Sequence, residues 1–151
     1  MSSFEEELEE NGTLVFTNKG TSMMPLLRQD RDLMVIVKKG EGRCKKYDAV
    51  LFKRGEKYVL HRILKVRPDD YYIVGDNNRR GEYVRDGQIL GVLRQVVRDG
   101  RTISVEDPAY LCYVHLWCDV FPLRAGILFL RDGALAVRRR IKRILKKGIK
   151  A

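Results

Sequence analysis

The chain carries one serine in a setting that could aim and activate its hydroxyl group. Ser22 lies in the stretch Gly20-Thr21-Ser22-Met23-Met24-Pro25-Leu26-Leu27, between a glycine that permits close backbone approach and a proline that stiffens the turn. A serine hydroxyl becomes a good nucleophile only when a neighbouring base accepts its proton. The chain offers two histidines, His61 and His115, as that base.

His61 falls within a predicted strand. Alternation along Lys57 to Val66 puts His61 on the same face as Val59 and Ile63, so we expect its ring to be partly desolvated. The ordinary imidazole pKa of about 6.5 allows this side chain to take up and return a proton near neutral pH. A single histidine on an apolar strand is otherwise a structural residue, and the serine motif is what favours a role as general base.

Three motifs occur in an order that resembles the type I signal peptidase family. They are Gly-x-Ser-Met-x-Pro from Gly20 to Pro25, a strand carrying His61-Arg62, and Gly-Asp-Asn from Gly75 to Asn77. The similarity covers about residues 13–97 and is to the archaeal and endoplasmic-reticulum branch, in which histidine replaces the bacterial lysine as base. It implies a Ser-His peptidase, with Ser22 as nucleophile and His61 as general base, that removes a leader or signal segment after small side chains.

An acidic side chain could complete this site by orienting the imidazole. The resemblance gives that role to Asp76, although Asp-Asn-Asn after a strand is also typical of a turn in which these side chains bond their own backbone. Family members often carry a second acid a few residues later, and the nearest one in this sequence is Glu82.

The oxyanion of an acyl-transfer reaction needs hydrogen-bond donors, usually backbone N–H groups. The amides of Ser22 and Met23 are the natural candidates. Gly20 has no side chain that could donate, so the Thr21 hydroxyl is the further side-chain candidate. Met23 and Pro25 match the motif and are expected to shape the floor of the pocket by packing.

Short β-rich runs separated by turn residues predict an antiparallel β domain. The predicted strands are Thr13 to Thr17, Leu33 to Val37, Ala49 to Lys53, Lys57 to Val66, Tyr71 to Val74, Gln88 to Arg98 and Arg101 to Val105. The expected fold class is mainly β with α elements, in which the sheet folds over or partly closes into a barrel. The resemblance implies the same fold, that of signal peptidases and self-cleaving repressors.

Helices are predicted on both sides of this β domain. Ser3 and Glu6 form a candidate capping box, which indicates a short acidic helix within residues 1–12. The β domain would then span residues 13–107. In residues 108–151, aromatic side chains recur every three or four positions up to Phe121, and apolar residues then alternate with arginine and lysine at helical spacing. We therefore expect an aromatic helix followed by a basic amphipathic helix, with Gly126 or Gly133 as a point where it could break.

The net charge of +10 belongs almost entirely to the C-terminal segment. Leu123 to Ala151 hold ten Lys or Arg and one acid, whereas residues 1–10 hold five glutamates and no base. The basic helix could bind anionic lipid or nucleic-acid phosphates, or its apolar side could pack on the domain; its apolar residues favour a membrane surface over nucleic acid. With no run of about 18 apolar residues and no signal peptide, a cytoplasmic or peripheral membrane location is expected.

Metal and cofactor chemistry is not expected. Cys112, His115 and Cys118 lie three positions apart, which on a helix spreads them too far for one metal ion, and the three cysteines form no disulfide framework. The alternative to a peptidase is a non-catalytic β module that binds a peptide or an anionic membrane surface.

Overall fold

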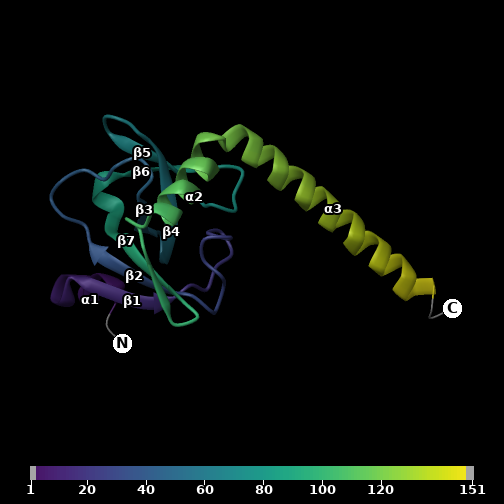
Figure 1. Ribbon diagram of the computed structural model, residues 1–151, viewed down its shortest axis with the longest axis horizontal. Helices are drawn as coiled ribbons and strands as arrows, with labels where there is room; N and C mark the ends of the chain where they lie inside the picture. The colour runs from purple at the N-terminus through teal and green to yellow at the C-terminus, as the bar shows by residue number, and fades with distance from the viewer. Residues whose placement is uncertain (1–2, 149–151) are drawn as a thin grey trace.

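An eight-stranded antiparallel sheet forms the body of the protein, and two helices follow it in the chain (Figure 1). The computed structural model describes residues 3–148. The strands are β1 (Thr13–Thr17), β2 (Leu33–Lys38), β3 (Ala49–Arg54), β4 (Lys57–Val66), β5 (Asp70–Val74), β6 (Glu82–Arg85), β7 (Ile89–Arg98) and β8 (Arg101–Ser104). The helical segments are α1 (Phe4–Asn11), the 3-10 turn η1 (Asp86–Gln88), α2 (Pro108–Asp119) and α3 (Phe121–Gly148).

The sheet is antiparallel throughout but does not close into a barrel. Its strand order is β1-β2-β7-β3-β4-β5-β6, and β8 pairs with β7 outside this path. Within the described residues, β1 pairs only with β2 and β6 only with β5, so both edges of the sheet remain open. The predicted antiparallel fold is confirmed and the predicted partial closure is corrected. Together with the helices, the result is a mixed α/β fold.

Strand β6 is the element that the sequence did not predict. Its four residues pair with β5, and only Val84 points its side chain into the core. The other strands begin and end within one residue of their predicted bounds.

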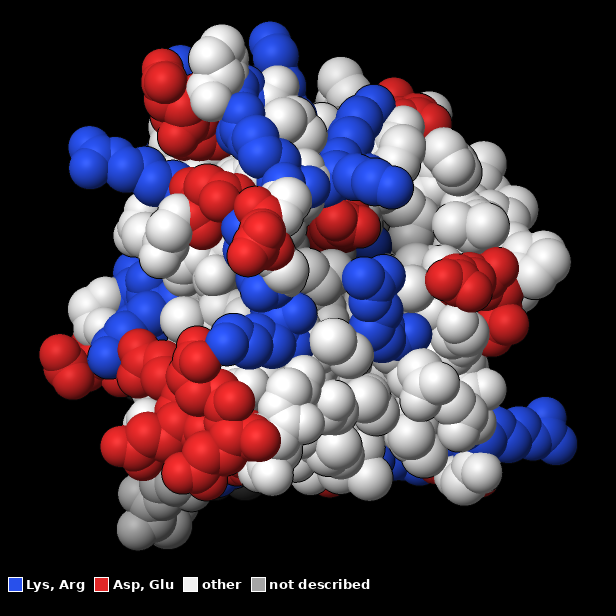
Figure 2. Space-filling model, turned by 90° about the vertical axis from the view of Figure 1, so that its left-hand side faces the viewer, with Lys and Arg blue, Asp and Glu red and all other residues white. Residues whose placement is uncertain are grey.

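The capping box of α1 is confirmed. The Ser3 hydroxyl accepts from the N–H of Glu6, and the Glu6 carboxylate accepts from the N–H of Ser3. Gly12 ends the helix with φ 68°, a left-handed conformation that suits glycine. Figure 2 shows the acidic side chains of α1 gathered at one corner of the molecule, beside the N-terminus.

The sheet curls so that distant strands share one core. The ring of Phe4 in α1 packs at a tilt against Phe16 of β1 at 4.6 Å and stacks on Tyr58 of β4 at 4.7 Å, measured between ring centroids. In the strand order β1 and β4 are separated by three other strands, so this contact requires strong curvature. The curvature is what places the segment after β1 opposite β4.

The two C-terminal helices follow directly on one another. Helix α3 is continuous through Gly126 and Gly133, so the predicted break at either glycine is wrong. The last residues of the predicted basic helix, 149–151, lie outside the described residues, as do residues 1 and 2 of the predicted N-terminal helix. Along residues 3–148, no helix is both long enough and apolar enough to cross a bilayer.

Candidate active site

Ser22 lies in the loop between β1 and β2, and buried neighbours anchor that loop. Met23 and Leu27 are buried in the core beneath it, whereas Ser22 is only partly buried. At the start of the loop, Asn18 accepts a hydrogen bond from the N–H of Gly20 and donates one to the Gly20 carbonyl. The backbone is therefore held in place while the serine side chain stays accessible.

Asn77, in the loop after β5, also binds the backbone of the serine segment. Its backbone N–H donates to the Ser22 carbonyl at 2.7 Å, and its side-chain Nδ2 donates to the Thr21 carbonyl at 3.0 Å. Asn77 belongs to the Gly-Asp-Asn motif, but the motif alone does not predict this role. The available signal was an amide side chain directly after Asp76, because such a side chain can bond the backbone of a neighbouring segment.

His61 is buried on β4, as the strand alternation predicted. Its side chain is only 7% exposed and lies near the ring of Phe52. Burial lowers the pKa of His61 below its ordinary 6.5, and the nearby carboxylate of Glu82 partly opposes this shift. The imidazole is thus neutral at pH 7 and able to accept a proton.

Gly75 is where the serine segment and His61 meet. A Cβ placed on Gly75 would lie 2.6 Å from the Ser22 carbonyl oxygen and 3.0 Å from Cδ2 of His61. The Ser22 carbonyl and the Cδ2 side of the His61 ring therefore both lie against Gly75. No hydrogen bond joins the Ser22 hydroxyl to the His61 ring.

Glu82 is the acid beside the imidazole. Its Oε1 lies 3.3 Å from Nδ1 of His61 and 3.0 Å from a guanidinium nitrogen of Arg54. The pair with His61 is an electrostatic contact, because Nδ1 is buried and within the described residues has no partner with hydrogen-bond geometry. Arg54 therefore shares the carboxylate that faces His61, and no local sequence pattern indicated this contact.

Asp76 is fully buried, and its carboxylate is bound by Arg62 instead of His61. Arg62 donates to both oxygens at 2.8 Å, and the Tyr113 hydroxyl donates to one of them at 2.9 Å. The Asp76 carbonyl accepts from the indole N–H of Trp117 at 2.7 Å. Burial alone would lower the pKa of Arg62, but the charge of Asp76 raises it well above its ordinary value. Asp76 thus joins β4 to α2, and Glu82 is the acid that the structure brings to His61.

The backbone amides proposed for the oxyanion are available. Within residues 3–148, the N–H groups of Ser22 and Met23 donate to no acceptor. Thr21 and Pro25 are exposed at the protein surface. Met23 packs into the core below, so it supports the serine loop without lining the cavity next to it.

A cavity of about 930 Å³ opens beside Ser22 and His61. It lies between the segment that leaves β1 and the first half of β4. Its apolar wall includes Phe4, Phe16, Met34, Leu51 and Leu60, and Asn78 lies with Ser22 and His61 among its polar groups. This volume suits several residues of a peptide or a ligand of similar size.

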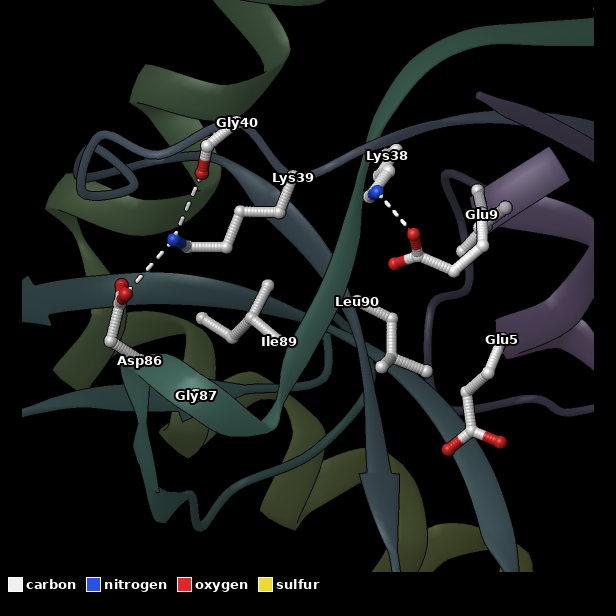
Figure 3. A pocket seen from close by; sticks show the side chains of 10 residues that line it. Glu5, Glu9, Lys38, Lys39, Gly40, Asp86, Gly87, Ile89 and Leu90 are labelled. Carbon is white, nitrogen blue, oxygen red and sulfur yellow. Dashed lines mark hydrogen bonds and ion pairs between the residues drawn. The ribbon is translucent and has the colours of Figure 1, made fainter. Parts of the chain in front are cut away.

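A second, smaller cavity of about 320 Å³ lies beside α1 and η1 (Figure 3). Its charged groups pair with one another: Lys39 contacts Asp86 at 2.9 Å, and Lys38 contacts Glu9. Because its charges are already satisfied, this cavity is a weaker candidate than the one beside Ser22.

The cysteines and His115 form no cluster with these groups. Cys44 and Cys118 are buried, Cys112 is exposed, and none forms a disulfide. His115 is exposed on α2, where its Nδ1 lies 3.2 Å from Asp119. Of the two histidines, His61 is therefore the one beside Ser22.

Comparison of the sequence with protein-family models and with curated proteins finds no match.

Proposed function

We propose that the protein is a serine endopeptidase that removes a leader or signal segment from a peptide or protein precursor. The observation that carries this proposal is that the Ser22 backbone and the ring of His61 both lie against Gly75 and that both residues line a large, mostly apolar cavity. Two backbone amides without acceptors, those of Ser22 and Met23, lie in the same segment.

In the proposed reaction, Oγ of Ser22 attacks the carbonyl carbon of the scissile peptide bond while Nε2 of His61 takes the hydroxyl proton. The amides of Ser22 and Met23 stabilise the negative charge that develops on the carbonyl oxygen. The imidazolium then protonates the leaving amine, and the C–N bond breaks. A water molecule, deprotonated by His61, then attacks the acyl carbon. The imidazolium returns this proton to Oγ as the bond between Oγ and the acyl carbon breaks, which restores Ser22 and releases the new carboxyl end.

The apolar wall of the cavity supports an apolar segment of peptide as the substrate. Phe16, Met34 and Leu60 offer packing surface, and the charged residues that line the cavity, Lys19, Arg54 and Lys57, are all basic. The resemblance to signal peptidases of the Ser-His type adds the expectation that the bond cut follows a small side chain.

A non-catalytic module that binds peptide is the second candidate. It is favoured by the missing hydrogen bond between the Ser22 hydroxyl and His61, whose Nδ1 also has no hydrogen-bond partner among the described residues. In that case the cavity would hold an apolar peptide, and Ser22 would be an ordinary loop serine.

A serine-directed acylating probe distinguishes the two candidates. We expect the probe to label Ser22 in the wild type, and His61→Gln to slow labelling at least about 100-fold. His115→Gln is the matched control, because it removes the other histidine without touching the cavity. Cleavage of a panel of leader peptides by wild type but not by Ser22→Ala completes the test. An inert Ser22 would favour the binding module.

A further inference from the structure

Helix α3 extends away from the body of the protein (Figure 1). Only its first turns pack on the body, where Arg124 and Leu128 are buried. Arg124 donates to the Asn78 carbonyl at 3.1 Å, and Arg131 donates to the Asn77 side chain at 2.7 Å. Beyond these contacts, the side chains described from residue 133 to 145 are all exposed.

An apolar stripe runs along the length of this helix. Its members fall on one side of the helix at 100° per residue and are 50–71% exposed: Leu123, Ile127, Leu130, Val137, Ile141, Ile144 and Leu145. At 100° per residue, the buried pair Arg124 and Leu128 lies about a third of a turn away from the stripe. The stripe is therefore not the side of α3 that packs on the sheet domain.

From Arg138 onward, the opposite side of the helix is basic, whereas nearer the body the exposed Phe129 and Leu135 lie off the stripe. Arg139 and Arg143 lie roughly opposite the centre of the stripe, with Arg138, Arg140 and Lys142 toward its flanks, and all five are exposed. The whole segment from residue 123 to the end holds ten Lys or Arg and one acid. Two chemically different faces thus occupy one exposed helix.

We propose that α3 binds an anionic bilayer surface, with the apolar stripe in the interface and the basic face toward lipid headgroups. An exposed helix of this design satisfies both faces at once at such a surface, because the stripe leaves water while the charges meet phosphates. The proposal concerns a surface distinct from the Ser22 cavity and does not depend on peptidase activity.

Two other occupants fit the helix less well. A second copy of the chain could pack stripe on stripe, but Arg131, Arg138 and Arg140 flank the stripe and would face the same charges on the partner. Nucleic acid would neutralise the arginines but would leave the seven apolar side chains in water. Charge and apolar pattern together therefore favour anionic lipid.

The test is co-sedimentation of the full-length protein with phosphatidylcholine vesicles, with and without phosphatidylglycerol. We expect binding only to the anionic vesicles, and binding that falls as salt rises. Leu130→Gln with Ile141→Gln keeps the charge and helix propensity but interrupts the stripe, and it should weaken binding at least tenfold. Ala136→Gln is the matched control on the other side of the helix and should bind like the wild type.

Arg139→Gln with Arg143→Gln tests the basic face separately. This variant should bind anionic vesicles more weakly and with a smaller salt dependence than the wild type. Equal binding to both vesicle types, or undiminished binding by the stripe variant, would overturn the proposal. The proposal would also be overturned if equilibrium centrifugation showed a dimer of the wild type and a monomer of the stripe variant, because the stripe would then be occupied by a second copy.

Discussion

The protonation of His61 depends on its burial and on two neighbouring charges, those of Glu82 and Arg54. Burial lowers the pKa of His61, the charge of Glu82 raises it and the charge of Arg54 lowers it. If neutral His61 is the general base, kcat/KM should rise with pH through this pKa, with a midpoint below pH 6.5. We expect Glu82→Gln to move the rising limb toward acid, because the imidazolium loses its stabilising neighbour.

Arg54→Gln provides the matched charge change of opposite sign. Removing this cation should move the rising limb of kcat/KM toward higher pH. The measurement is the pH profile of both variants with one peptide substrate. If Glu82 had only a structural role, Glu82→Gln would change the rate or the stability but not the midpoint of the rising limb of kcat/KM. That result would refute an electrostatic effect of Glu82 on His61.

Gly75 is required by the close approach of the two halves of the site. An added Cβ would come within 2.6 Å of a backbone oxygen of the serine segment, so Ser22 and His61 would have to move apart. We expect Gly75→Ala to lower kcat/KM about 100-fold or more, since small misplacements of reacting groups have effects of this size. At Gly42 a Cβ would meet nothing within 4 Å, so Gly42→Ala should retain full activity. Equal activity of the two variants would show that the site does not form around Gly75.

The sequence identified the parts of the candidate site but not all of their partners. Ser22 and His61 were found because a motif and a strand alternation are local patterns. Asp76 is separated from His61 because consecutive residues of a strand point to opposite faces of the sheet. Arg62 follows His61 on β4, so its side chain points the other way, where it binds the buried carboxylate of Asp76. A buried arginine needs such a counter-ion, and this was the usable signal.

Among the elements, helix α2 depends on Asp76 for its place on the sheet. Tyr113 and Trp117 of α2 both bond to Asp76, which Arg62 holds from β4. Asp76→Asn leaves a fully buried guanidinium without its charge partner, so we expect a loss of about 3 to 5 kcal/mol in the free energy of unfolding. Tyr113→Phe removes one hydrogen bond and should cost about 1 kcal/mol. Urea denaturation measures the loss of unfolding free energy in both variants. Equal losses would argue against the Arg62–Asp76 pair as the main attachment of α2 to the sheet.

Regular elements were predictable where their pattern was long. Strand β6 was missed because its four residues include two charges and one inward-facing apolar side chain, and it forms only by pairing with β5. The expected break in α3 did not occur because a glycine inside a helix costs only about 1 kcal/mol, which the hydrogen bonds of a 28-residue helix outweigh. Curvature of the sheet and its open edges left no local signal at all.

On the scale of the whole molecule, the two strongly charged helices lie apart. The acidic helix α1 lies against β1 and β2, whereas the basic helix α3 extends from the other side of the body (Figure 1). Among the side chains described between residues 3 and 145, the glutamates of α1 and the cations of α3 therefore do not pair within one molecule. The body between them carries the Ser22 cavity, bounded by α1 on one side and by the Asn77 loop, to which α3 is attached, on the other.

Acid should destabilise the whole fold in two separate pH ranges. Because burial lowers the pKa of His61, the unfolded chain takes up this proton first, and stability should begin to fall below about pH 6.5. Burial alone would raise the pKa of Asp32, but hydrogen bonds from Arg28 and Arg98 hold it at about 2. Stability from this carboxylate is complete above about pH 4 and is lost as the pH falls toward 2.

Urea denaturation at pH 7, 5 and 3 separates the two contributions. His61→Gln should remove the change in unfolding free energy between pH 7 and 5 and leave the lower range intact. Asp32→Asn should be less stable by about 2 to 3 kcal/mol at pH 7 and should lose the dependence below pH 4, because no carboxylate remains to be protonated. Since Arg98 also bonds the Leu26 carbonyl, the same variant should loosen the serine loop and slow acylation of Ser22. An Asp32→Asn protein with wild-type stability at pH 7 would show that these ion pairs do not hold the loop to β7.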